Sequence, residues 1–141
     1  MPRARLYKKG NTSKIEPMKV LIVEDEEALR KVMQEKMEHA GFDTSAAKDG
    51  AEAWDMAKSK NPDIILLDLV LPKRNGFDVL GMLKQDPGLK DIPVIVLSNL
   101  AEDESLKKAL AMGAEDYFVK AQHPINEIVE KVQNRLLEKS R

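Results

Sequence analysis

The sequence predicts an α/β domain, in which a parallel sheet carries helices on both faces. Two observations lead to this prediction. Apolar runs at residues 20–23, 64–67 and 94–97 are unbroken rather than alternating, which is typical of strands buried on both faces. Helical patterns of apolar residues separate these runs, and strands that alternate with helices along a chain form parallel sheets.

The first two strand-helix units lie before residue 63. The strand at 20–23 precedes a helix whose apolar positions recur at helical spacing and end near Gly41. A weaker strand follows at 42–47, and Asp49 is a plausible N-cap for a short helix that Pro62 stops. These two units therefore place two strands and two helices in the first half of the domain.

Three further units complete the domain. Their strands are expected at residues 64–67, 94–97 and 117–119. After a loop from Pro72 to Gly76, the third helix stops at Asp86-Pro87-Gly88, and the fourth ends at Gly113. The last helix is amphipathic, with apolar residues from Ile125 to Leu136. We therefore expect a sheet of five strands.

Polar residues follow four of these strands directly. Right-handed crossovers bring the carboxyl ends of parallel strands to one edge of the sheet, and open sheets of this kind bind ligands there. The polar residues at this edge are Glu24, Asp25, Asp68, Ser98 and Lys120. We expect them to converge on one pocket.

Such a pocket has a defined chemistry. Clustered carboxylates repel one another and tend to take up protons unless a cation lies between them. Mg²⁺ accepts oxygen ligands and commonly uses one or two carboxylates together with waters and a phosphate oxygen. A carboxylate such as Asp68, with a metal, a lysine and a hydroxyl around it, is suited to accept a phosphoryl group, while Lys120 neutralises charge on the phosphoryl oxygens.

Composition limits the class of protein. With 33% charged residues and a net charge of -1 in 141 residues, no strong field favours nucleic acid or acidic lipid as a partner. The absence of cysteine excludes disulfides and thiolate metal sites. No apolar stretch approaches the roughly 20 residues that span a bilayer. We expect a cytoplasmic protein without a membrane partner.

The first 17 residues differ from the rest. Five basic residues against one acidic residue give them a net charge of +4, which leaves -5 for residues 18–141. Because this segment is polar and lacks apolar periodicity, we expect a flexible basic N-terminal extension. The domain itself is expected at residues 18–141.

Five motifs resemble those of one family, the receiver domains of two-component response regulators, also called CheY-like domains. The motifs are Val20-Leu-Ile-Val-Glu-Asp25, Asp49-Gly50, Leu66-Leu-Asp-Leu-Val-Leu-Pro72 with Gly76, Pro93-Val-Ile-Val-Leu-Ser98, and Gly113-Ala-Glu-Asp-Tyr-Phe-Val-Lys120. The resemblance covers residues 18 to about 138. Each motif alone is weak, but five in this order are specific.

The resemblance implies a role for each matching residue. Asp68 would be the phosphoacceptor, and Lys120 would contact a phosphoryl oxygen. Ser98 would be the hydroxyl that moves to the phosphoryl group, and Tyr117 the aromatic residue that turns inward. The Mg²⁺ ligands would be Asp25, Asp68, the backbone carbonyl of Val70 and, through a water, Glu24.

The resemblance also implies the fold and the function. The sheet would have the flavodoxin-like strand order 2-1-3-4-5. The domain would accept a phosphoryl group from a histidine kinase or phosphotransfer protein and signal by binding a downstream protein. It would be no enzyme beyond slow self-phosphorylation and autodephosphorylation. From the length of the chain we expect a stand-alone receiver.

Three positions depart from the usual family pattern. Glu24 stands where aspartate is more usual and should still reach the metal. Asn99 stands where a small residue is usual, and this would narrow the access of phosphodonors to Asp68. Ala121 replaces a proline that forms a cis bond, and since a cis bond to another residue costs about 3 kcal/mol, we expect a trans bond.

Two alternative functions belong to other classes. One is an interaction module that kept the fold and works without phosphorylation, which Asn99 and Ala121 favour. The other is a Mg²⁺-dependent phosphohydrolase of the haloacid dehalogenase type with Asp68 as nucleophile. That family has a second aspartate two residues after the nucleophile, where this chain has Val70.

Overall fold

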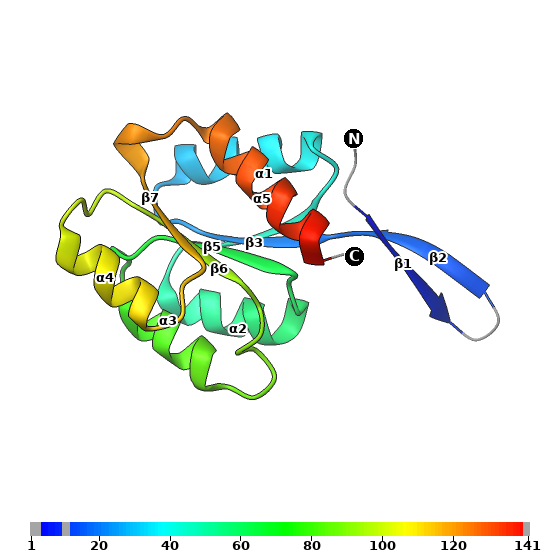
Figure 1. The fold of residues 1–141 in the computed structure, drawn as a ribbon, viewed down its shortest axis with the longest axis horizontal. Coiled ribbons are helices and arrows are strands. Elements are labelled where there is room, and N and C mark those ends of the chain that lie inside the picture. Colours follow the sequence, from blue (N-terminus) through cyan, green and yellow to red (C-terminus); the bar gives the residue numbers. More distant parts are fainter. Residues whose placement is uncertain (1–3, 10–11, 140–141) are drawn as a thin grey trace.

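The structure, a computed structural model, describes residues 4–9 and 12–139. Figure 1 shows a central sheet between two layers of helices, and a separate pair of strands that projects from one end. The central sheet contains β3 (Lys19–Val23), β4 (Asp43–Ala47), β5 (Ile64–Leu67), β6 (Val94–Ser98) and β7 (Asp116–Val119).

The strand order confirms the predicted fold. The order is β4-β3-β5-β6-β7, and each neighbouring pair is parallel. Counted from β3 as the first strand, this is the flavodoxin-like order 2-1-3-4-5. The chain reverses its direction of winding at β3, so the carboxyl ends of β3 and β5 flank the switch point where such sheets bind ligands.

Each face of the sheet has its own apolar layer. On one face lie α1 (Glu27–His39) and α5 (Ile125–Lys139), which bury Met33, Met37, Ile128, Val132 and Leu136. The other face carries α2 (Gly50–Lys60), α3 (Gly76–Gln85) and α4 (Asp103–Ala111). All four residues of β5 are buried, as an unbroken apolar run predicts.

The N-terminal segment, which we expected to be a flexible extension, contains strands that the sequence analysis did not predict. It contains two antiparallel strands, β1 (Ala4–Lys9) and β2 (Thr12–Pro17), with Ala4 opposite Pro17. The sequence signal for them was the pair Gly10-Asn11 between two short runs, because Gly-Asn pairs favour hairpins. The mobility of this segment and the domain boundary at residue 18 remain predictions.

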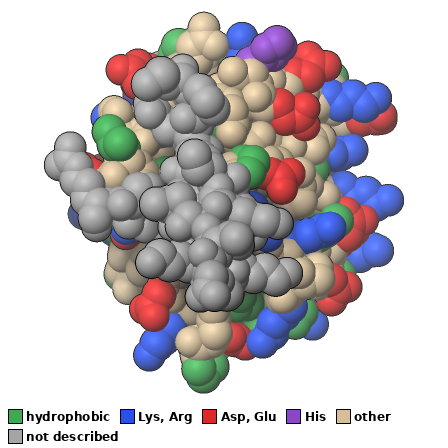
Figure 2. All heavy atoms as spheres, turned by 90° about the vertical axis from the view of Figure 1, so that its right-hand side faces the viewer, with side chains coloured by type: hydrophobic (Ala, Val, Ile, Leu, Met, Phe, Trp, Pro, Cys, Tyr) green, Lys and Arg blue, Asp and Glu red, His purple; other side chains and the backbone are tan. Residues whose placement is uncertain are grey.

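Two properties of the structure bear on membrane and nucleic-acid binding: the character of its helices and the distribution of charge on the face that Figure 2 shows. Across residues 4–9 and 12–139, no helix has the length and apolar character that crossing a membrane requires. On the face that Figure 2 presents, acidic and basic side chains lie among one another outside the grey region. That face therefore has no extended field of one sign.

Candidate functional site

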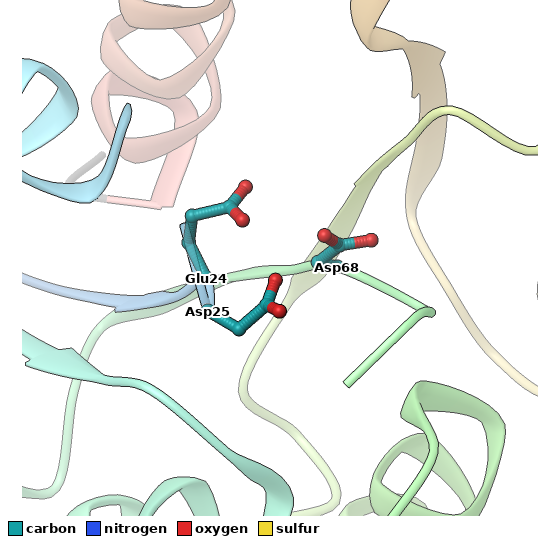
Figure 3. A group of neighbouring side chains, drawn as sticks. All are labelled: Glu24, Asp25 and Asp68. Carbon is teal, nitrogen blue, oxygen red and sulfur yellow. The ribbon is translucent and has the colours of Figure 1, made fainter. Parts of the chain in front are cut away.

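Three carboxylates meet at the carboxyl ends of two neighbouring strands. Glu24 and Asp25 follow β3, Asp68 follows β5, and the last residues of these strands, Val23 and Leu67, are paired. Carboxylate oxygens of all three side chains lie within 4.8 Å of one another. Figure 3 shows them at the ends of their strands, around a common space. Glu24 is 2% exposed and Asp68 6% exposed, whereas Asp25 faces solvent.

Lys120 supplies the positive charge of this cluster. Its ammonium donates to Asp68 Oδ2 at 2.8 Å and to Glu24 Oε1 at 2.5 Å. Burial alone would lower the pKa of Lys120, but the hydrogen bonds to Asp68 and Glu24 outweigh burial, so its pKa is raised. Burial raises the pKa of Glu24 despite the hydrogen bond from Lys120. The ammonium therefore holds two buried carboxylates together.

A pocket of about 220 Å³ opens over this cluster. Its lining residues are Glu24, Asp25, Glu26, Asp68, Val70, Asn99 and Lys120. Glu26 is a lining residue that the sequence did not single out, because it sits among other acidic residues at the start of a helix. Asn99 lines the pocket, which is the position from which its side chain could narrow the access of phosphodonors to Asp68. The narrowing itself remains a prediction.

Ser98 and Tyr117 lie beside this pocket rather than in its lining. Ser98 is fully buried at the end of β6, and its hydroxyl accepts a hydrogen bond from the N–H of Leu100 at 3.3 Å. The hydroxyl of Tyr117 donates to the carbonyl of Leu100 at 2.6 Å. Burial raises the pKa of Tyr117. Both side chains thus hold the backbone of one residue, Leu100, in the loop between β6 and α4.

The loop after Asp68 is held by close packing against Gly76. A Cβ at Gly76 would lie 2.3 Å from Leu69 Cα and 2.4 Å from the carbonyl oxygen of Asp68, which is closer than real contacts allow. The N–H of Gly76 also donates to the carbonyl of Leu69 at 2.7 Å. Glycine is therefore required at residue 76, because α3 begins directly against the backbone that carries Asp68.

The same loop rests on the start of α2. A Cβ at Gly50 would lie 2.4 Å from Arg74 Cβ, and Lys73 adopts a left-handed backbone conformation with φ 67°. Asp49 caps α2 by accepting from the N–H of Glu52 at 2.8 Å, as the sequence predicted. The start of α2 and the start of α3 together fix the path of residues 69–75.

The cluster fits a small hard cation. Carboxylate oxygens from Glu24, Asp25 and Asp68 converge, and such oxygen donors are those that Mg²⁺ and Mn²⁺ prefer. The carboxylate of Asp25 has no hydrogen-bond partner among residues 4–9 and 12–139, so it is available to a cation. The N–H of Val70 donates to Asp68 Oδ1 at 3.1 Å, and Val70 lines the pocket.

The Lys120–Ala121 bond is trans, as expected for a residue other than proline. Residues Lys120–Gln122 form a 3-10 turn directly after β7. In spite of the change from proline, Lys120 reaches both Asp68 and Glu24.

Comparison with known proteins identifies the family. The family model of the response regulator receiver domain matches residues 20–133. The chain belongs to this family. It is 38% identical over 108 residues to the alkaline phosphatase synthesis transcriptional regulatory protein PhoP of Bacillus subtilis, covering 75% of this chain and 43% of PhoP. This chain thus spans about half or less of the length of such relatives.

Two solved receiver structures show the same fold. The Mn²⁺-bound form of response regulator Rcp1 has a TM-score of 0.71 and 31% identity, over 84% of this chain and 91% of Rcp1. The phosphorylated cyanobacterial phytochrome response regulator RcpA has a TM-score of 0.74 and 30% identity, over 88% of this chain and 96% of RcpA. The domain is thus a phosphorylation-activated receiver, a signalling module rather than a classical enzyme.

Membership of the receiver family bears on one of the two alternatives that the sequence left open. The haloacid dehalogenase alternative is not supported, since the matching family is that of receivers. The expectation that nucleic acid is not a partner is not confirmed, because PhoP is a transcriptional regulator of which the chain covers less than half. That residues 18–139 do not bind nucleic acid stays a prediction.

Proposed function

We propose that Asp68 is the phosphoacceptor of this receiver and that a divalent cation, Mg²⁺ in the cell, binds beside it. The observation that carries the proposal is the position of Lys120 Nζ, which bridges Asp68 and Glu24 in a pocket that Asp25 also lines. A carboxylate with a fixed cation beside it and a free carboxylate opposite has the parts that phosphoryl transfer needs.

In the transfer, a carboxylate oxygen of Asp68 attacks the phosphorus of a phosphohistidine. A P–O bond forms, the P–N bond breaks, and the departing imidazole takes up a proton. Lys120 moves its hydrogen bond from the carboxylate of Asp68 to a phosphoryl oxygen, which keeps its charge paired throughout. Slow loss of the phosphoryl group to water would return Asp68 to its free state.

Asp25, Asp68 and the carbonyl of Val70 would bind the cation directly, and Glu24 would bind it through a water. When bound, the cation neutralises charge that builds up on the phosphoryl oxygens. Glu24 is longer than the aspartate usual at its position, and in this structure its carboxylate is tied to Lys120 at 2.5 Å. This contact supports a water-mediated rather than a direct role.

The partners follow from the same chemistry. A histidine kinase or phosphotransfer protein would supply the phosphoryl group, and a downstream protein would read the phosphorylated form. The family's signalling role supports both, as it supports a cytoplasmic location. The net charge of -5 on residues 18–141 gives the domain no general attraction to nucleic acid. The relatives that suggest an output in transcription are about twice as long as this chain.

Signal transmission would use Ser98, Tyr117 and Leu100. If the Ser98 hydroxyl turns toward a phosphoryl oxygen, it gives up the hydrogen bond from the Leu100 N–H in exchange for a stronger, charge-assisted bond. Tyr117 holds the carbonyl of the same residue, so a shift of Leu100 reaches β7 and α4. The difference in bonding between the two states is what moves the population.

The test is uptake of phosphate from acetyl phosphate with Mg²⁺, measured by intact-mass spectrometry. The wild type should gain one phosphoryl group, and Asp68→Asn, which keeps shape but lacks the nucleophile, should gain none. Asp63→Asn is a matched control, because Asp63 is also a buried aspartate but lies at the opposite end of β5. A phosphoryl adduct on Asp68→Asn would show that another residue is the acceptor.

A further inference from the structure

We infer that Arg30 is a positioning residue for the cation ligand Asp25. Arg30 lies in the first turn of α1, half-buried, one turn after the acidic loop. Its Nη1 donates to the carbonyl of Glu24 at 2.9 Å and to the carbonyl of Asp25 at 3.3 Å. This inference rests on the proposed function, because it assigns Arg30 a role toward the same cation site.

The two carbonyls belong to the peptide groups on either side of Asp25. The Glu24 carbonyl is part of the peptide bond that precedes the Cα of Asp25, and the Asp25 carbonyl is part of the bond that follows it. Because one guanidinium nitrogen contacts both, it restrains the backbone rotation of Asp25 from both directions. The Asp25 side chain itself is exposed and has no hydrogen-bond partner among the described residues.

Other contacts hold Glu24 on several sides but reach only the peptide group that follows Asp25, through the N–H of Glu26. The N–H of Glu24 donates to the carbonyl of Ala47 at 3.0 Å, and its carboxylate accepts from Lys120 and from the N–H of Glu26. The N-cap of α1, Glu26, makes no side-chain capping hydrogen bond. The orientation of Asp25 therefore depends more strongly on Arg30 than the orientation of Glu24 does.

Positioning and simple electrostatics make opposite predictions for this residue. A guanidinium near a cation site repels a divalent ion, so removal of its charge alone would tighten binding. Loss of an orienting partner behind a ligand weakens binding, commonly by about tenfold or more. The direction of the change in affinity therefore distinguishes the two roles, and a purely structural role would leave the affinity of the folded protein unchanged.

The experiment measures Mn²⁺ affinity by the electron paramagnetic resonance signal of free Mn²⁺, at a temperature where circular dichroism shows each variant folded. Arg30→Met keeps the aliphatic stem and should weaken binding about tenfold. Arg30→Lys keeps the charge and can reach one carbonyl, so it should give an intermediate affinity. Lys31→Met is the matched control, since Lys31 is the next cation of α1 and pairs with exposed Glu27 at 3.0 Å.

Each result has a defined meaning. Weaker binding by Arg30→Met with unchanged or tighter binding by Lys31→Met supports the inference. Unchanged or tighter binding by Arg30→Met overturns the inference and leaves the cation site in place. Absence of Mn²⁺ binding by the wild type overturns the proposed cation site itself, and the role of Arg30 with it.

Discussion

Lys120 Nζ lies 2.8 Å from Asp68 Oδ2, although the two residues are 52 positions apart in the chain. The contact joins the residue that follows β7 to the residue that follows β5, across the intervening strand β6. The side chain must span one strand, which the long stem of lysine permits. The ammonium thereby occupies one oxygen each of Asp68 and Glu24, and a metal cation at the pocket would compete with it for these oxygens.

Mg²⁺ should stabilise the fold, because a bound cation relieves repulsion among Glu24, Asp25 and Asp68. A ligand that binds only the folded state raises the melting temperature with concentration. Thermal melts with and without millimolar Mg²⁺ measure this, and Asp25→Ala should lose most of the shift. An equal shift in the wild type and in Asp25→Ala would argue against cation binding at this pocket.

Lys120→Met should destabilise the cation-free protein and make it more responsive to Mg²⁺. Removal of one partner from a buried ion pair costs about 3 kcal/mol, and the opening of the pocket to water reduces that cost. Because the ammonium no longer competes for Asp68 and Glu24, Mg²⁺ should raise the melting temperature more than it does in the wild type. A smaller Mg²⁺ response than that of the wild type would contradict competition between ammonium and metal.

The Ser98→Ala variant should still accept a phosphoryl group, but less of the resulting conformational change should reach Leu100, Tyr117 and α4. Its hydroxyl bonds the Leu100 N–H in the free state, and alanine removes the group that exchanges this bond for one to the phosphoryl oxygen. Amide NMR shifts with and without beryllofluoride measure the spread of the change. In the wild type we expect shifts at Leu100, Tyr117 and α4, and in Ser98→Ala shifts confined to the acidic pocket. Equal spread in both proteins would exclude Ser98 as the relay.

Gly76→Ala should damage the site as well as the fold. Its added methyl group must displace the backbone of Asp68 or Leu69, and such overpacking costs about 2 kcal/mol. Gly81→Ala is the control, since a Cβ there would meet only Met112 Cε, at an ordinary 3.4 Å. Chemical unfolding should show loss of stability in Gly76→Ala alone, together with slower phosphorylation from acetyl phosphate.

Asp49 should make stability depend on acidic pH. Its hydrogen bond from the Glu52 N–H lowers its pKa below the ordinary 3.8. A carboxylate with a lowered pKa in the folded state stabilises the fold above its unfolded pKa and loses that contribution as pH falls through the folded value. Asp49→Asn keeps the cap without the charge. In urea unfolding it should cost about 0.5 kcal/mol at pH 7 and less at an acidic pH below 3.8. A cost that is the same at both pH values would mean that the charge contributes nothing.

The apolar runs predicted the parallel sheet and the residues at its carboxyl edge, because buried parallel strands leave unbroken apolar runs and end in polar residues. The strand order was predicted only from the resemblance to receiver domains. The sequence did not reveal that Ser98 and Tyr117 both contact the backbone of Leu100, since the N–H and carbonyl groups of the backbone are the same for every residue type. Arg30 was equally hidden. In the sequence it is one of several basic residues in α1, and only the direction of its guanidinium separates it from Lys31.

The strands β1 and β2 were missed for a different reason. Their residues are polar and carry a strong positive charge, which outweighed the Gly10-Asn11 signal for a turn. Composition describes whether a segment can bury a core and does not indicate whether two strands pair with each other.

Because the core is divided into two layers, one side of the molecule could report phosphorylation while the other side serves as an internal reference signal. Tyr117 belongs to the layer beneath α2, α3 and α4, while the side chains of α1 and α5 pack against the opposite face. A fluorophore attached to exposed Leu110 on α4 would lie on the side that carries Ser98's relay. A second dye with a distinct emission at exposed Glu35 on α1 would lie on the side that the proposed relay does not enter, and the ratio of the two signals would read out phosphorylation independently of concentration.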